Sequence, residues 1–174
     1  MLVSTNGKAP MFETMFSMAC TYNSSSRILR DKINKEDKYK FFFPSVICYS
    51  FSIELFLKFF HLIDFPEVFT KKYFTKFNIN IKAHSLSTLW DSLNINYKEE
   101  IVGQFRGVGG FARDVNEFRE VLVTELGDDP FVKWRYIHEE EEGHYYLSLD
   151  MVSNVNDALG YCAQKYYNLH KSSR

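Results

Sequence analysis

Residues 41–63 read FFFPSVICYSFSIELFLKFFHLI and form the most apolar stretch of the chain. After Pro44, apolar residues lie nearly all round a helical period, which predicts one buried helix. Glu54 and Lys58 interrupt it at i and i+4, so they share a helical face and can form an ion pair. Because an unpaired buried charge is costly, both must pair with each other or with other helices, and Arg135 is a candidate partner for Glu54.

The same stretch is the one part of the sequence that could span a membrane. On insertion scales the gain from its aliphatic and aromatic residues roughly equals the cost of two central charges. His61, Pro44 and the amphipathic remainder of the chain favour a core helix, with membrane insertion of 41–63 as the weaker alternative. The N-terminal residues lack the order of a signal peptide, so we expect a cytoplasmic protein without a membrane partner.

Composition predicts one globular domain over residues 1–174, with residues 1–9 and 171–174 frayed. Hydrophobic residues make up 45% and charged residues 25% of the chain. The net charge of −1 provides no overall basic field, so any nucleic-acid contact must rest on a local patch. The 3 cysteines are widely spaced and form no CxxC pair, which indicates buried free thiols in a reducing cytoplasm.

Helical periodicity predicts an all-α, up-and-down bundle of about five helices. Ser85 is the expected N-cap of one of them, and the glycines at 107–110 are expected to break another. Residues 66–83 are the least predictable, with a short helix and then an extended segment expected there. The predicted helices run from Pro10 to about Asp31, from Pro44 to about Asp64, from Leu86 to Leu93, from Tyr97 through the glycine break to Leu126, and from about Asp150 to Leu169.

Two patterns bear on nucleic acid or metal binding. Residues 71–82 hold four lysines and no acid, interleaved with aromatic residues, so Lys71 and Lys72 are candidate RNA contacts. An ordinary solvated loop is the alternative there. His138 and His144 are six residues apart, too far to share a helical face as in an HExxH motif, so we expect neither a metal nor another cofactor.

Three features could carry chemistry. Glu54 and Lys58 are charges on a buried helix, and either serve a site or form an internal salt bridge. His84 lies just before a helix cap, where it either contacts phosphate or packs on the bundle. Arg135 and His138, three apart, would share one face of a helical turn, where they could bind phosphate and act as general acid or base in RNA cleavage.

Taken in order, three segments resemble the HEPN superfamily of all-α domains associated with nucleotides and RNA. Residues 52–58, SIELFLK, are similar to that family's apolar, Glu, leucine-rich, Lys pattern on its second helix. Residues 83–86, AHSL, resemble the start of its third helix, and residues 134–136, WRY, resemble the Arg-Tyr that precedes its final helix. The ordered set spans roughly residues 10–170.

The resemblance implies a helical bundle that often dimerises. Many members are ribonucleases of toxin–antitoxin or phage-defence systems, and others are inactive binding domains. Active members carry an Arg followed by a His at a short set spacing. This sequence departs from that spacing after Arg135, since the next histidines are His138 and His144.

We therefore expect a protein that engages RNA or a nucleotide. If it is an enzyme, we expect a metal-independent endoribonuclease with Arg135 and His138 as its catalytic residues. The expected partners are a second copy of the chain, RNA or a nucleotide, and a cognate antitoxin. The alternative is an inactive helical interaction and dimerisation module of the same fold. The residues expected to bind RNA or nucleotide are Glu54, Lys58, His84, Lys71 and Lys72.

Overall fold

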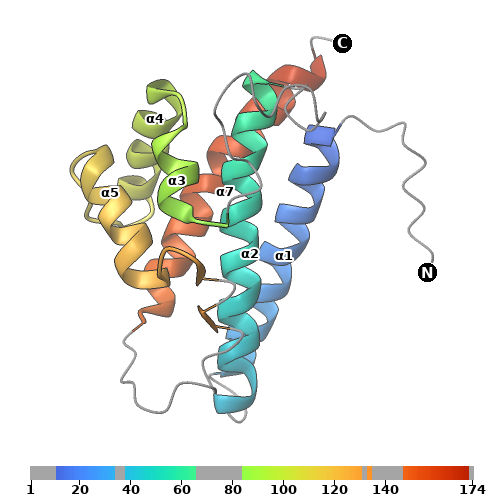
Figure 1. The fold of residues 1–174 in the computed structure, drawn as a ribbon. Coiled ribbons are helices and arrows are strands. Elements are labelled where there is room, and N and C mark those ends of the chain that lie inside the picture. The colour runs from blue at the N-terminus through green and yellow to red at the C-terminus, as the bar shows by residue number, and fades with distance from the viewer. Residues whose placement is uncertain (1–10, 34–37, 66–83, 131–132, 135–146, 173–174) are drawn as a thin grey trace.

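The computed structural model describes residues 11–33, 38–65, 84–130, 133–134 and 147–172. Every regular element within these ranges is a helix, which confirms the predicted all-α bundle (Figure 1). The shorter elements are α3 (Leu86–Asp91), α5 (Val115–Val121) and the π-helix η1 (Leu122–Leu126). The long helices are α1 (Met11–Ile33), α2 (Lys38–Asp64), α4 (Ile95–Gly107) and α7 (Leu149–Ser172).

Helices α2 and α7 lie side by side and run in the same direction. Towards the middle of α2 and near the start of α7, the Tyr49 hydroxyl lies 3.3 Å from Ser153 Oγ. At the same level the Asn156 amide donates to the backbone carbonyl of Tyr49 at 3.3 Å. Towards the ends of both helices, the rings of Phe60 and Tyr166 meet edge to face with centroids 6.1 Å apart. Both polar and aromatic contacts thus join the two helices.

Helix α1 runs antiparallel to this pair. Arg30, near its end, forms an ion pair with Asp150 at the start of α7. Phe16, near its beginning, stacks on Tyr167 near the end of α7, with ring centroids 4.4 Å apart. Figure 1 shows the resulting layer, in which α1 descends beside α2 and α7 lies behind.

Helix α4 also runs antiparallel to α7, which completes the up-and-down order of the long helices. Tyr97, in its first turn, packs edge to face on Tyr166 at 4.8 Å and donates to Asp64 Oδ1 at 2.6 Å. Just beyond its end, a Cβ built on Gly109 would lie 3.8 Å from Nδ2 of Asn154 in the early turns of α7.

Helix α2 is the central element of the core, as its apolar sequence predicts. Phe56, Leu57 and Phe60 are buried, and the segment Lys40–Asp64 is long and apolar enough to cross a membrane by length and composition. Neighbouring helices bury 78% of its most apolar window. Burial inside the bundle is therefore enough to explain the apolar sequence on which the alternative of membrane insertion also rests.

The predicted start of α2 is wrong. The helix begins at Lys38, so Pro44 lies inside it. Proline removes one intrahelical hydrogen bond, to the carbonyl of residue 40, but Lys40 and Pro44 are both exposed and water can reach that carbonyl. The ring of Phe41 lies beneath the ammonium groups of Lys32 and Lys40, at 5.2 and 5.6 Å, which ties this first part to α1.

The predicted helical stretch from Tyr97 to Leu126 is interrupted at its glycines, as expected. α4 ends at Gly107, Gly109 adopts a φ of 94°, and α5 resumes at Val115 with Asp114 as its N-cap. The last five residues form η1, a wider turn that periodicity did not distinguish from α-helix. η1 ends at Gly127, whose φ of 87° is the left-handed conformation that favours glycine.

Two further predictions concern the end of the chain and the thiols. α7 continues to Ser172, so residues 171 and 172, predicted to be frayed, are helical, while residues 1–9 and 173–174 lie outside the described residues. All three cysteines are free. Cys162 is buried, which raises the pKa of its thiol to about 12, whereas Cys20 and Cys48 are only partly covered.

Gly110 and Gly103 provide a matched pair for testing the glycine turn. A Cβ on Gly110 would lie 2.4 Å from ring atoms of the fully buried Phe105, whereas nothing lies within 4 Å of a Cβ on Gly103. We expect Gly110→Ala to lower the free energy of unfolding by about 1–3 kcal/mol, because Phe105 has no room to move. Gly103→Ala, inside α4, should instead raise it by about 0.5–1 kcal/mol. Urea unfolding of both variants checks this, and equal effects would contradict it.

Candidate functional site

Glu54 and Lys58, the two charges on α2, form an ion pair with each other within the helix. Lys58 Nζ lies 2.5 Å from Glu54 Oε1, and both side chains are almost fully buried, with 10% and 3% exposed. Glu54 precedes Lys58 by one helical turn, the favourable order for such a pair. The expectation that these two residues pair with each other is confirmed.

His84 is the third member of the cluster and comes from a different part of the chain. Its Nδ1 lies 3.1 Å from Oε1 and 3.3 Å from Oε2 of Glu54. A carboxylate oxygen accepts, so Nδ1 carries the hydrogen and the geometry of the ring directs Nε2 away from Glu54. Half of the His84 side chain, 51%, is exposed. The structure therefore brings together three of the predicted site residues, with the histidine at the surface.

The start of α3 holds His84 in place. Ser85 caps this helix, as predicted, and its side chain accepts from Thr88 N. Asp128, in the turn after η1, binds the same end, because its carboxylate accepts from Ser87 N at 2.8 Å and from Ser85 Oγ at 3.0 Å. Burial alone would raise the pKa of Asp128, but these hydrogen bonds from Ser87 and Ser85, with the charge of Arg119, lower it overall.

The far end of α3 is tied to α2 by His61. Its Nε2 donates to the backbone carbonyl of Leu89 at 3.0 Å and lies 3.2 Å from Ser92 Oγ. Burial lowers the pKa of this imidazole, the charge of Lys98 acts in the same direction, and the Leu89 carbonyl and Asp64 partly oppose them. α3 is thus held on α2 at both ends, by Glu54 at one and His61 at the other.

The remaining predicted site residues lie outside the described residues. These are Arg135, His138, Lys71 and Lys72, so the pairing of Arg135 with Glu54 stays a prediction. Trp134, just before Arg135, is buried and donates from Nε1 to the carbonyl of Leu126 at 2.9 Å.

Two residues of this region were not singled out by sequence reasoning. Asp128 stands in a Gly-Asp-Asp-Pro turn that predicts only a helix stop. His61 was used only as evidence against a membrane span. Both act through contacts between distant segments, and the sequence carries no spacing signal for such contacts.

The cluster can orient an imidazole and present it to a ligand. A carboxylate behind Nδ1 fixes the tautomer and leaves Nε2 to accept a proton, or to donate one to a phosphate oxygen when the ring is charged. Lys58 balances the charge of Glu54, so the buried part of the cluster is neutral as a pair. Across the described ranges, no group of three or more His, Cys, Asp or Glu side chains is arranged to hold a metal ion.

Comparison of the chain with models of known protein families, with curated proteins and with solved structures finds no match.

Removing one charge of the buried pair should destabilise the protein more than removing both. Glu54→Gln leaves the Lys58 ammonium buried beside a neutral amide, and we expect it to lower the free energy of unfolding by about 3 kcal/mol or more. Adding Lys58→Met removes the stranded charge and should recover much of that loss. Urea unfolding of the wild type and both variants measures this. A double variant as unstable as Glu54→Gln would show that the charge pair is not what the bundle depends on.

His61 should make stability depend on pH. Its pKa in the folded protein lies below the ordinary imidazole value, so the unfolded chain binds more protons at mildly acidic pH. The free energy of unfolding should therefore fall as pH drops below about 6.5. The fall should be shallower in His61→Gln, whose side chain does not titrate, while His84 and His170 are present in both proteins. Denaturant midpoints measured across this range give the two slopes, and identical slopes would refute the assignment.

Proposed function

We propose that the protein engages RNA or a nucleotide, and that His84 contacts a phosphate group. The contact between His84 Nδ1 and the buried Glu54 carboxylate carries the proposal. It supplies an oriented, half-exposed imidazole whose other nitrogen is directed away from the protein's own carboxylate. A protonated imidazole donates a charge-assisted hydrogen bond to phosphate, which is stronger than a neutral one.

The resemblance to the HEPN superfamily adds the expected chemistry. It favours metal-independent cleavage of RNA, with a second copy of the chain and an antitoxin as partners in the cytoplasm. Arg135 and His138 are the nearest substitutes for the family's catalytic Arg and His, whose spacing this sequence does not keep. These assignments rest on the sequence segments at 52–58, 83–86 and 134–136 and extend the proposal beyond the His84 contact.

A second candidate is an interaction module without catalytic activity. The observation that favours it is the closure of the Glu54–Lys58 pair within α2, because the two charges satisfy each other without a ligand. In this alternative His84 completes a structural cluster, and the fold serves only to present its surface.

RNA binding and RNA cleavage distinguish the two candidates. We expect His84→Ala to weaken binding of a labelled RNA by about tenfold or more, the equivalent of one hydrogen bond to a charged group. The substituted side chain is half-exposed, so the variant should remain folded. His170→Ala, on the exposed last turn of α7, is the control and should bind as the wild type does.

Cleavage is measured on the same RNA with a chelator present. Arg135→Ala and His138→Ala should each reduce it by about a hundredfold or more, the usual contribution of general acid–base catalysis. Binding that depends on His84, with no cleavage by the wild type or any variant, would support the phosphate contact and contradict the nuclease assignment. Wild-type protein that neither binds nor cleaves RNA or mononucleotides would favour the interaction module.

A further inference from the structure

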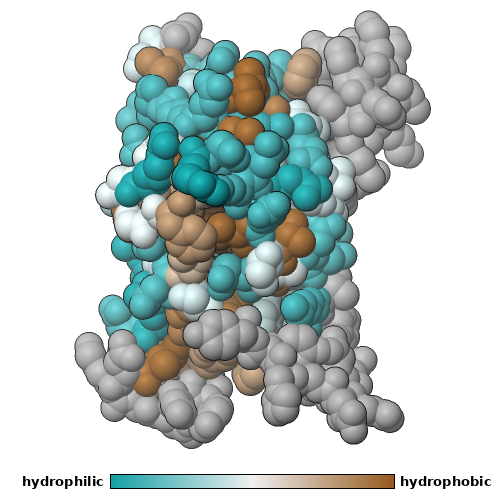
Figure 2. Space-filling view, turned by 90° about the vertical axis from the view of Figure 1, so that its left-hand side faces the viewer, coloured by the Kyte–Doolittle hydropathy of each residue, from teal (hydrophilic) through white to brown (hydrophobic). Residues whose placement is uncertain are grey.

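A second feature lies at the surface, where the segment after the glycine turn meets α5, and plays no part in the His84 cluster. It is a hollow of about 440 Å³ beside α5 and η1, here called the acidic hollow. Figure 2 views the molecule from the side of α3, α4 and α5, where apolar side chains reach an otherwise hydrophilic surface. The lining residues used below are Phe111, Arg113, Glu117, Glu120, Val121 and Glu125.

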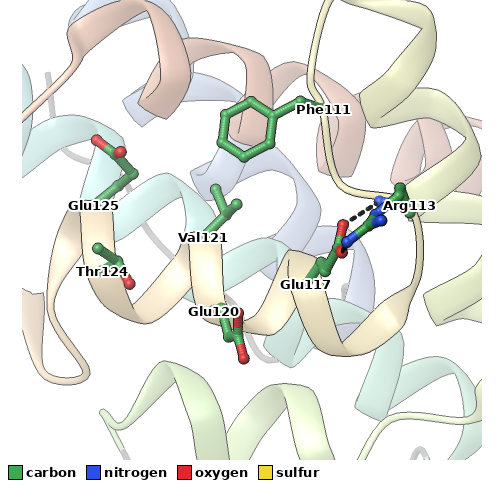
Figure 3. Close-up of a pocket in the computed structure, with 7 residues that line it drawn as sticks. All are labelled: Phe111, Arg113, Glu117, Glu120, Val121, Thr124 and Glu125. Atoms are coloured by element: carbon green, nitrogen blue, oxygen red, sulfur yellow. Dashed lines mark hydrogen bonds and ion pairs between the residues drawn. The ribbon is translucent and has the colours of Figure 1, made fainter.

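The glycine turn places an aromatic ring at the rim of the acidic hollow. Phe111 follows Gly110 directly and is 65% exposed, whereas its neighbour Ala112 is fully buried. Figure 3 shows Phe111 and Val121 facing one another, with Glu125 on one side and the Arg113–Glu117 pair on the other. A large apolar ring held outward beside an apolar floor is a surface on which another planar group can stack.

The helix supplies carboxylates on the same side. Glu117, Val121 and Glu125 are spaced at i, i+4 and i+8, so they lie along one face of α5 and η1. The π-turn of η1 carries Glu125, whose Oε2 accepts from the backbone N–H of Ser148 at 3.1 Å. π-turns are frequent at functional sites, and here the turn forms one wall of the hollow.

The charges of the acidic hollow are unbalanced. Among the lining residues that the structure describes, Arg113 is the one cation. It is already engaged, since its Nε donates to Glu117 Oε1 at 2.7 Å and its backbone N to Oε2 at 2.8 Å. Glu120 has no ion-pair partner within the described part of the chain, and Glu125 receives only the Ser148 N–H there. Figure 3 shows Glu120 directed to the opposite side of α5, whereas Glu125 lies on the same side of the helix as Phe111 and keeps its second carboxylate oxygen for another donor. A carboxylate beside an exposed aromatic ring is the complement of a planar cation.

We propose that the acidic hollow binds an arginine side chain from a basic segment of a partner protein. A guanidinium can stack on an aromatic face while its edge donates to a carboxylate, so Phe111 with Glu125 suits it better than a lysine ammonium. The openness of the hollow favours a side chain carried on a polypeptide. A small molecule needs most of its surface covered, and the rim residues Phe111 and Arg113 are themselves largely exposed. This proposal makes no use of the RNA assignment.

The test uses the full chain and a fluorescein-labelled Gly/Ser peptide that carries two arginines, with twin peptides carrying citrulline or lysine. Citrulline keeps the shape of arginine and removes its charge. Fluorescence anisotropy should show the arginine peptide binding at least tenfold more tightly than the citrulline peptide, and more tightly than the lysine peptide. Phe111→Ala should weaken the arginine peptide by about two- to fivefold, the equivalent of losing one exposed cation–π contact.

Charge variants locate the binding. Glu125→Gln should weaken the arginine peptide by about threefold or more, in line with a lost contact to a charged donor. Glu120→Gln should have a smaller effect, because this carboxylate is directed to the other side of α5. Glu99→Gln removes the same charge from an exposed position on α4 outside the lining, and should leave the affinity unchanged. Thermal unfolding of each variant confirms that it is folded.

Three outcomes would overturn the proposal. The first is no binding of the arginine peptide up to about 1 mM, the weak limit of a specific contact. The second is equal weakening by Glu99→Gln and Glu125→Gln, which would indicate a general attraction of positive charge. The third is tighter binding of spermine than of the arginine peptide, with the same dependence on Glu125, which would make a small polyamine the ligand.

Discussion

The fold depends on how one apolar helix accommodates two charges. α2 is surrounded by other helices, yet it carries a carboxylate and an ammonium that lose most of their contact with water. Their separation of one turn lets each neutralise the other without help from the rest of the protein. The carboxylate of Glu54 also binds a group from elsewhere, since His84 Nδ1 lies 3.1 Å from Oε1, the oxygen that Lys58 contacts, and 3.3 Å from Oε2. The ion pair thus sets both the burial of α2 and the position of α3 above it.

Two regions of the surface follow from this arrangement and differ in charge. At the His84 cluster the buried charges cancel, and the half-exposed imidazole is the group that meets solvent. At the acidic hollow the carboxylates exceed the cations, and Phe111 provides an apolar rim. The first suits an anionic ligand once the imidazole is protonated, and the second a cationic one. The loop between α4 and α5 and the turn after η1 connect them, since Asp128 caps α3 a few residues beyond Glu125.

The local features of this structure could be predicted from the sequence, but few of the features that depend on contacts between distant segments could. The spacing of Glu54 and Lys58 was enough to predict their pairing, and Ser85 was enough to predict the start of α3. The predicted start of α2 at Pro44 was wrong. Proline's preference for the first turn of a helix is local, whereas Lys32 on another helix contacts the turn that precedes Pro44. The roles of Asp128 and Phe111 depend on which turns lie beside which helices, and periodicity carries no such information. Arg135 and His138 remain predictions from the sequence alone.

The hydrogen bonds between α2 and α7 have a consequence for how the chain reaches a single folded state. When one helix shifts along another, apolar side chains can exchange neighbours, so the stabilising free energy of their packing is lost only gradually. Asn156 cannot, because its amide meets the Tyr49 carbonyl at a single alignment of the two helices, and Ser153 meets the Tyr49 hydroxyl at the same alignment. Shifting α7 by one residue would leave these polar groups buried and unbonded, at a cost that a repacked apolar surface does not recover. These few polar contacts therefore fix the register of α7 against α2. They select one of the many alignments that a purely apolar interface would allow.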